Sequence, residues 1–564
     1  MDRLNLTLSI LLLFLFQNIF AQEHINQLVK ENVYVNTNSS TLLTGEKLYY
    51  AVTCLNTIKA TLSEYSKIAY VELINNDKQI VFKNKLFLKN SKGNSEYFIP
   101  TTLKTGKYKL LAYTNWMLNS TPIKVNSIDI NIINPYRAFE EQNFPQLESG
   151  EKNDLNIRNL NSIYEIDKRK YTTREKIKLK LNESKDIDNQ SSYTLKVFKK
   201  DTITSFFNQN ESLSTINNTI IISKKTNTFI TPEFRGEIIK GKIKAKSSDE
   251  INLKNISIAL SITGNNSFFK IIQSNNNGEF CFTIEKRFKN EDLKFQIIDE
   301  DHSKYNLEIE DSNYLDYSNL KFGNLILTPN LKKSLERRSI ASQIENAYFK
   351  TKNDSLNNND IAEISSLKFD LVFNLNDYTR FQTMKETLTE IIGGAYYKSV
   401  DKKNEIHIID NISEYKLTYP ALVLIDGLYI QDVNEIFNYN IDNVETISIT
   451  RGGYYYGYKI YNGVIFIKTK KNDYEPANKN SYLIEPKTIR PQQEKEYFNI
   501  DYTKKDYSRI PDYRHQLIWI PDLKADNKEI SFYTSDISGV FEIVLEGIDS
   551  KGNKNIFYDS FEVE

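Results

Sequence analysis

Apolar and polar residues alternate over the first quarter of the chain. From position 33 to about 135, runs such as 47–52, 68–73 and 106–113 place apolar side chains at every second position, and short polar turns separate them. This period of two is typical of β-strands that bury one face. The pattern predicts an antiparallel β-sandwich over residues 22–135.

The same alternation returns in three further parts of the chain, after a proline-spaced linker at 134–151. Segments 152–225, 233–328 and 495–564 each contain several alternating runs bounded by polar turns. Each of the three is long enough for a small two-layer domain. We therefore predict three more β-sandwiches.

Residues 331–372 interrupt the strand pattern. This segment begins with a charged, glycine-poor stretch in which Ile340, Ile344 and Tyr348 recur at helical spacing, and it continues into an asparagine-rich link. We predict an exposed helical connector followed by a polar linker.

Residues 375–471 mix both periodicities. Three β-branched apolar runs, at 421–425, 444–449 and 464–467, are separated by a turn, a short helical pattern at 431–439 and a glycine-rich aromatic stretch. This order predicts a compact β-α-β-β unit. The expected fold class is mainly β, with tandem antiparallel β-sandwich domains and one α/β domain.

Glycine-containing pairs punctuate this unit. Asp426 and Gly427 predict a tight turn with positive φ angles, and Asn462 and Gly463 predict another before the last strand. Between them, glycines interrupt a tyrosine cluster, which predicts a mobile loop rather than a regular element. The residues that punctuate the cluster are Arg451, Gly452 and Gly457.

The wording of this unit resembles the plug domain of TonB-dependent outer-membrane receptors. The shared motifs are L-I-D-G at 424–427, R-G at 451–452, Y-G at 456–457 and N-G-V-I-F-I-K-T-K at 462–470, and residues 381–394 resemble the plug's first helix and its C-cap. In that family a barrel of about 22 strands follows the plug. The segment after 471 is too short for such a barrel, so we expect a plug-like domain without a receptor barrel. The motif residues are Asp426, Gly427, Arg451, Gly452, Gly457, Asn462 and Gly463.

The β-rich segments resemble two other families. The motifs V-Y-V-N-T at 33–37 and L-K-T-G-K-Y-K-L-L-A-Y-T at 103–114 resemble macroglobulin-like domains of bacterial alpha-macroglobulins, although the thioester motif G-C-G-E-Q is absent. Segments 152–225 and 495–564 are interpreted as further domains of this type. The motif N-G-E-F-C-F at 277–282 resembles the carboxypeptidase regulatory-like domain, which implies spacing and docking rather than peptidase chemistry.

The N-terminus has the features of a secretory signal peptide over residues 1–21. Arg3 supplies positive charge, residues 8–16 form a short apolar core, and Ala21 provides a small residue before Gln22. The apolar run is too short to span a bilayer as an ordinary helix. We expect an exported protein that is associated with the outer membrane, on its periplasmic side or at the cell surface.

Composition and reactive residues add few chemical candidates. Lys plus Arg equals Asp plus Glu at 73 each, so no net field favours nucleic acid. Cys54 and Cys281 fall in different predicted domains, and two free buried thiols are favoured over a disulfide. No metal, cofactor or catalytic motif is found, and we predict that the protein is not an enzyme. The histidines are scattered: His24, His302, His407 and His515.

Two functions fit these observations. The first is a non-enzymatic cell-envelope adaptor that docks its plug-like domain on an outer-membrane barrel, transporter or secretion complex, and so reaches the membrane through its partner. The alternative is a surface binding protein for glycan or protein ligands. A tyrosine cluster could form that surface, since aromatic faces bind sugars, or it could be a turn packed on the sheet. Its members are Tyr454, Tyr455, Tyr456 and Tyr458.

Overall fold

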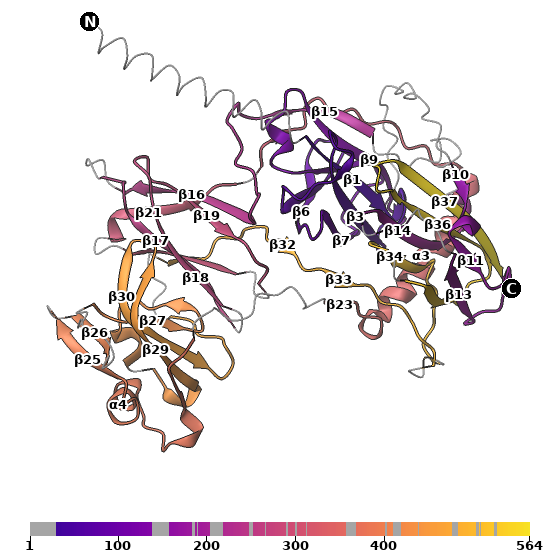
Figure 1. The fold of residues 1–564 in the computed structure, drawn as a ribbon. Coiled ribbons are helices and arrows are strands. Elements are labelled where there is room, and N and C mark those ends of the chain that lie inside the picture. The colour runs from indigo at the N-terminus through magenta and orange to yellow at the C-terminus, as the bar shows by residue number, and fades with distance from the viewer. Residues whose placement is uncertain are drawn as a thin grey trace, which may run out of the picture. The chain divides into compact units, whose positions relative to one another are not determined.

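The computed structural model shows a mainly β fold, which confirms that part of the predicted class (Figure 1). The chain forms two compact units: unit 1 comprises residues 1–236, 314–357 and 491–564, and unit 2 comprises 237–313 and 358–490. The predicted signal peptide lies outside the described residues. The structure describes residues 30–137, 157–182, 187–188, 190–203, 218–246, 252–264, 267–288, 292–298, 302–311, 313–356, 368–400, 403–409, 419–437, 439–476, 483–503, 507, 509–523 and 527–564.

Unit 1 begins with a two-sheet sandwich. Its strands alternate buried and less buried residues, and a continuous apolar core from Val33 to Ile132 fills the space between the sheets. One sheet contains β1 (Glu31–Thr37), β3 (Lys47–Asn56), β4 (Thr61–Leu62) and β7 (Lys92–Phe98). The other contains β2 (Thr41–Leu43), β5 (Ile68–Ile74), β6 (Ile80–Phe87), β8 (Gly106–Tyr113) and β9 (Ile123–Ile133).

Three strands from later in the chain complete the second of these sheets. Strand β15 (Asn218–Lys224), predicted within the 152–225 domain, instead pairs with β9. Strand β22 (Leu315–Asp316) pairs with β15, and β32 (Pro491–Gln492) pairs with β6. The edges of this sheet therefore pair with strands that lie far away in the sequence. A local sequence pattern could not predict which sheet these strands join.

The predicted sandwiches at 152–225 and 495–564 are not separate domains, which corrects that assignment. Strand β14 (Ser192–Lys199) pairs with both β34 (Gln516–Ile520) and β36 (Gly539–Ile548), and one apolar core contains residues of both segments. In Figure 1 the yellow C-terminal strands lie among the violet ones. The other strands of the two sheets that these segments build together are β10 (Ile157–Asn159), β11 (Tyr164–Ile166), β12 (Lys170–Tyr171), β13 (Lys176–Leu181), β35 (Glu529–Tyr533) and β37 (Lys554–Val563).

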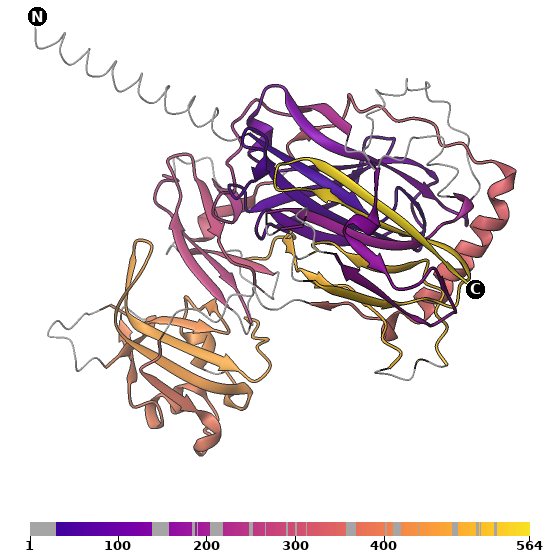
Figure 2. The ribbon, with the colours of Figure 1, turned by 45° about the vertical axis from the view of Figure 1, so that its right-hand side comes forward.

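The predicted connector helix exists as α3 (Lys332–Ala347), shown in Figure 2 in salmon, between the 3₁₀ turns Pro329–Leu331 and Phe349–Thr351. Its apolar residue Ile340 is 57% exposed, whereas Arg338 is buried. The helix is therefore held to unit 1 by a charged side chain, and the expectation of a wholly exposed connector was wrong. Beyond it, β23 (Ser355–Leu356) pairs with β33 (Lys495–Glu496).

Unit 2 contains a small sandwich with phenylalanines at its centre, among them Phe282 and Phe295. The predicted domain 233–328 extended too far, because residues 314–328 belong to unit 1. One sheet contains β16 (Glu237–Ala245), β19 (Glu279–Ile284) and β21 (Tyr305–Ile309). The other contains β17 (Ser257–Ile262), β18 (Phe268–Gln273), β20 (Leu293–Ile298) and β31 (Leu483–Ile484).

The second part of unit 2 is a five-stranded mixed sheet with two short helices. Strand β24 lies before the predicted start at 375, yet it pairs with β29 and belongs to this sheet. The helical pattern at 431–439 forms only the short α5. In order, the sheet contains β24 (Leu371–Asn374), β29 (Val444–Tyr456), β30 (Lys459–Thr469), β27 (Leu422–Ile425) and β28 (Leu428–Tyr429); α4 (Met384–Glu390), α5 (Asn434–Phe437) and the hairpin of β25 (Ala395–Val400) and β26 (Lys403–Ile408) accompany it.

The turn at Asp426 and Gly427 forms as predicted, with φ angles of 48° and 90°. It joins β27 to β28. The buried Asp426 carboxylate accepts hydrogen bonds from the Thr469 amide at 2.8 Å and hydroxyl at 2.6 Å, and from the Tyr474 amide at 3.1 Å. The aspartate therefore also fixes the end of β30.

The other glycine-rich segment is a strand pair, which corrects two predictions. Strand β29 continues through Arg451 and Gly452 to Tyr456, so Tyr454 to Tyr456 lie in a strand rather than a loop, and only Gly457 and Tyr458 form the turn. Asn462 and Gly463 lie inside β30 rather than in a turn. The register shifts between Thr450 and 453, and a β-bulge of this kind accommodates the positive φ of Gly463 within a strand.

Candidate functional sites

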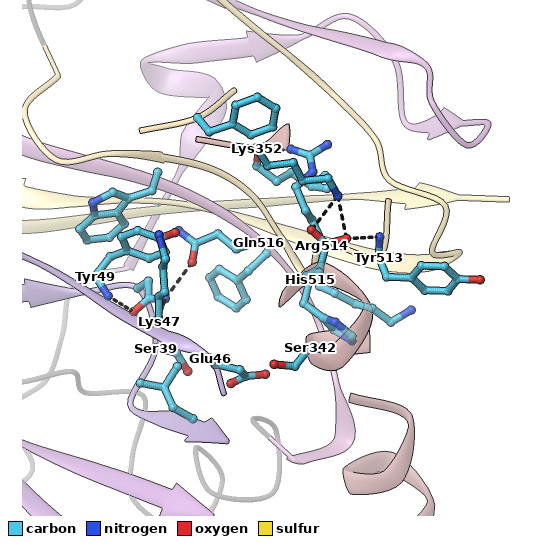
Figure 3. A pocket seen from close by; sticks show the side chains of 18 of the residues that line it. Ser39, Glu46, Lys47, Tyr49, Ser342, Lys352, Tyr513, Arg514, His515 and Gln516 are labelled. Atoms are coloured by element: carbon cyan, nitrogen blue, oxygen red, sulfur yellow. Dashed lines mark hydrogen bonds and ion pairs between the residues drawn. The ribbon is translucent and has the colours of Figure 1, made fainter. Parts of the chain in front are cut away.

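A cavity of about 230 Å³ lies in unit 1. Its walls come from the start of β3, the end of β14, helix α3 and the segment 497–519. Figure 3 shows Ser39, Glu46 and Ser342 along its lower edge, with Lys352 and Arg514 at the upper right. Side chains that are separated by more than 400 positions in the sequence thus share one pocket.

Arg338 organises the wall that helix α3 provides. Its guanidinium binds Glu46 through two contacts, Nε to Oε1 at 2.7 Å and Nη2 to Oε2 at 2.8 Å. It also donates to Asp201 Oδ2 at 2.9 Å and to the Thr41 carbonyl at 3.0 Å. A planar guanidinium suits such a two-point contact, so the buried charge is fully compensated.

Most other charged residues of the wall are ion-paired, and Lys199 donates to the Ser538 carbonyl instead. Lys352 Nζ lies 2.7 Å from Glu345 Oε2, and Lys47 Nζ lies 3.1 Å from Asp354 Oδ2. Arg514 Nε lies 2.7 Å from Asp512 Oδ1. These contacts leave the cavity close to electrically neutral.

Aromatic rings form another part of the wall. Tyr49 makes an edge contact with Tyr497 at a centroid distance of 5.0 Å and stacks on Trp519 at 6.1 Å. Lys47 Nζ lies 5.2 Å from the ring centre of Phe349. The cavity therefore combines apolar faces with charged groups that already have partners.

Two buried polar atoms of the wall have no hydrogen-bond partner among the described residues. Trp519 is 5% exposed and its Nε1 is unpaired, and the buried Gln516 Nε2 is unpaired too. The Tyr49 hydroxyl, the Ser342 hydroxyl and the His515 ring line the same cavity. Buried polar groups are normally hydrogen-bonded, so this concentration distinguishes the cavity.

His515 precedes β34 and lines the cavity. Burial lowers the pKa of its imidazole from 6.5 to about 4, and the nearby Arg338 charge adds to the shift. The ring is therefore neutral at pH 7.

Acidification should destabilise unit 1 through His515. The unfolded chain takes up the proton near pH 6.5 and the folded chain only near pH 4, so stability is lost as the pH falls between these values. We expect the loss in wild type to exceed that in His515→Gln by on the order of 2 kcal/mol. Urea unfolding followed by tryptophan fluorescence at pH 7, 5.5 and 4.5 measures it, because both tryptophans, Trp116 and Trp519, lie in unit 1.

A matched control is His302→Gln, which changes a histidine of unit 2. That variant should keep the wild-type dependence on pH. An equal loss of unfolding free energy on acidification in wild type and in His515→Gln would contradict the assignment of a buried neutral imidazole.

The sequence reasoning missed this cavity. It recorded His515 only as one scattered histidine, and Arg338 lay in a segment predicted to be exposed. A lone histidine carries no spacing signal. Neither does a mid-helix arginine such as Arg338, because its partners Glu46 and Asp201 are more than 130 positions away.

The tyrosine cluster of unit 2 occupies the tip of the β29–β30 hairpin (Figure 1). Tyr454 and Tyr456 pack against the small sandwich, and Tyr456 lies 5.2 Å from Phe269 between ring centres. Tyr455 and Tyr458 are 74% and 73% exposed. The predicted interaction surface is therefore divided, with two tyrosines covered and two available to a partner.

The motif residues have structural positions. Arg451 and Gly452 form the bulge opposite Gly463, next to Asn462, which pairs with Gly453. Gly457 forms the hairpin tip and would place a Cβ 2.5 Å from the Ile271 carbonyl oxygen. Asp426 and Gly427 contact the other end of β30, at Thr469. The structure thus gathers four of the seven at one place.

Other candidate chemistry is limited. Cys54 is buried as predicted, whereas Cys281 is exposed, and the two do not form a disulfide. Across the described ranges, no three His, Cys, Asp or Glu side chains are grouped as a metal site would require. In the same part of the chain, no helix is both long and apolar enough to cross a membrane.

Comparisons with known proteins give a limited picture. No protein-family model matches the chain, and no curated protein matches it. Among solved structures, Salmonella alpha-2-macroglobulin reacted with methylamine is 8% identical with a TM-score of 0.23, and it aligns with 94% of this chain and 39% of its own. The native Escherichia coli alpha-2-macroglobulin has the same identity and TM-score, with coverages of 95% and 40%.

A third similar structure is the dimeric latent PorU of Porphyromonas gingivalis, 8% identical with a TM-score of 0.15, covering 50% of this chain and 33% of its own. The chain spans about two fifths of the length of the alpha-2-macroglobulins it matches. These TM-scores are too low to support an argument about function.

Proposed function

We propose that the chain is a non-enzymatic cell-envelope adaptor whose plug-like domain docks on an outer-membrane barrel, transporter or secretion complex. The observation that carries the proposal is the exposure of Tyr455 and Tyr458 at the tip of the β29–β30 hairpin. Exposed tyrosines are enriched in protein interfaces because they combine a large apolar surface with a hydroxyl group. The resemblance of residues 375–471 to receptor plugs supplies the class of partner.

The packing within unit 2 supports a docking role for this tip. One face of the β27–β30 region, including Leu422, Leu424 and Phe466, is buried against Ala259 and other residues of the small sandwich. That face is therefore covered within the chain itself. A partner must use the remaining surfaces, and the sandwich holds the hairpin for it as a rigid support.

Two exposed tyrosines, Tyr455 and Tyr458, are enough to supply much of the binding energy of a small docking site. A few aromatic side chains near the centre of an interface often supply most of its binding energy. The alternative, a surface protein that binds glycan or protein ligands, would use the same two side chains. The two functions differ in the partner: the adaptor binds a membrane barrel, whereas the alternative protein binds a glycan or another protein ligand.

The test replaces both tyrosines at once. Full-length Tyr455→Ser/Tyr458→Ser should lose a barrel protein that wild type retains from detergent-solubilised outer membranes, since the apolar contact area disappears. Quantitative mass spectrometry of the retained proteins measures the loss, which we expect to exceed tenfold, because two interface tyrosines contribute roughly 1–2 kcal/mol each or more.

The control is Phe229→Ser, which removes a 60% exposed aromatic side chain from unit 1. It should retain the barrel protein at the wild-type level. Equal retention by the double tyrosine variant would overturn the proposal. This test is preferable to deleting residues 375–471, because that deletion would leave β24 behind and uncover the apolar face around Ala259.

A further inference from the structure

The cavity of unit 1 is a second candidate for binding, separate from the tyrosine hairpin. Its volume of about 230 Å³ is far larger than the roughly 10–15 Å³ that one ordered water requires. It is smaller than the pockets of about 300–1,000 Å³ that hold drug-sized molecules. The dimensions therefore suit a ligand of one or two small rings.

The charges of the wall limit the ligand to neutral compounds. Glu46 and Asp201 are held by Arg338, and Asp354 is held by Lys47. An anionic ligand would meet these carboxylates, and a cationic ligand would meet the amino and guanidinium groups that neutralise them. Apart from Lys199, which donates to the Ser538 carbonyl, the charged side chains of the wall are already compensated, and desolvating a ligand charge without a partner is unfavourable.

The remaining wall offers apolar faces and unpaired polar groups together. Phe198, Phe349 and Phe498 line the cavity and contribute only carbon atoms. Tyr49 and Ser342 bring hydroxyl groups to the wall, and the buried Gln516 Nε2 and Trp519 Nε1 have no hydrogen-bond partner among the described residues. A compound with an apolar ring face and several hydroxyl groups satisfies both kinds of surface at once.

We infer that this cavity binds a neutral saccharide, which packs its ring on the phenylalanines and exchanges hydrogen bonds with Tyr49, Ser342 and His515. Hydroxyl groups both donate and accept, so they match groups of either polarity. The buried Trp519, whose Nε1 is also unpaired, lines the same cavity and reports on its occupancy. This site lies in unit 1 and does not depend on the docking function proposed for unit 2.

The experiment uses the full chain with Trp116→Phe, which leaves Trp519 as the single tryptophan. It is titrated at millimolar concentrations with methyl glucoside, methyl N-acetylglucosaminide, cellobiose and chitobiose. We expect at least one of them to shift Trp519 emission and to give saturation-transfer NMR signals. Adding Tyr49→Phe or Ser342→Ala should each weaken that binding by about fivefold, the effect of one lost hydrogen bond.

The matched control is Tyr65→Phe, which removes an exposed hydroxyl of unit 1 that does not line the cavity. It should bind like the parent protein, and circular dichroism establishes that all variants are folded. The inference is overturned if none of the four sugars binds, or if Tyr49→Phe and Ser342→Ala leave binding unchanged. Occupancy by an uncharged aromatic peptide such as N-acetyl-phenylalanyl-alanine amide in place of every sugar would overturn it as well.

Discussion

Replacing Arg338 by alanine is expected to lower the free energy of unfolding of unit 1 by about 3–5 kcal/mol, the range for breaking a buried ion pair by removing one partner. The guanidinium compensates Glu46 and Asp201, which are largely buried. Without it, two largely buried carboxylates that share this guanidinium would lose their counter-charge. Helix α3 would then lose its main buried contact.

Urea unfolding followed by tryptophan fluorescence measures this change. Two controls separate charge from packing. Arg337→Ala removes a neighbouring exposed arginine of the same helix and should change stability by less than about 0.5 kcal/mol. The triple variant Arg338→Met/Glu46→Gln/Asp201→Asn, which removes all three charges together, should recover much of the loss. A stability of Arg338→Ala within error of wild type would refute the anchoring role.

Gly427→Val is expected to destabilise unit 2 by about 3 kcal/mol or more. A Cβ at this position would lie 2.2 Å from Ser267 Cβ, and the φ angle of 90° is unfavourable for a β-branched residue. The contact with Ser267 pushes the turn away from the small sandwich, and the φ angle strains the backbone of the turn itself. Strain of this kind amounts to roughly 1–3 kcal/mol.

Gly452→Val is the matched control, since Gly452 has a φ angle of 89° and no atom within 4 Å of the added Cβ. It should show the conformational strain without the steric clash, and so destabilise unit 2 by less than Gly427→Val. Hydrogen exchange of peptides from 419–437 and 439–476 measures both variants. Equal protection in the two variants would contradict the close contact at Ser267.

The turn at Asp426 illustrates what local sequence can predict. A D-G pair after four apolar residues demands positive φ angles, and this requirement depends on two residues alone. The pair at Asn462 and Gly463 has the same chemistry, yet it lies inside β30. There the positive φ is absorbed by a bulge opposite Arg451 and Gly452, and only the pairing partner decides between a turn and a bulge.

The sequence by itself determined many of the strands, helix α3 and the D-G turn, because periodicity and turn chemistry act over a few neighbouring residues, while helix α4 was expected from the resemblance of 381–394 to receptor plugs. It could not determine which strands share a sheet. Residues 192–199 pair with 516–520 and 539–548, which lie more than 300 positions away in the sequence. An incomplete sheet with an apolar face can pair with different strands, so the strand pattern alone does not define its partner. The cavity likewise exists only where distant segments meet, since Arg338, Glu46 and His515 have no local pattern in common.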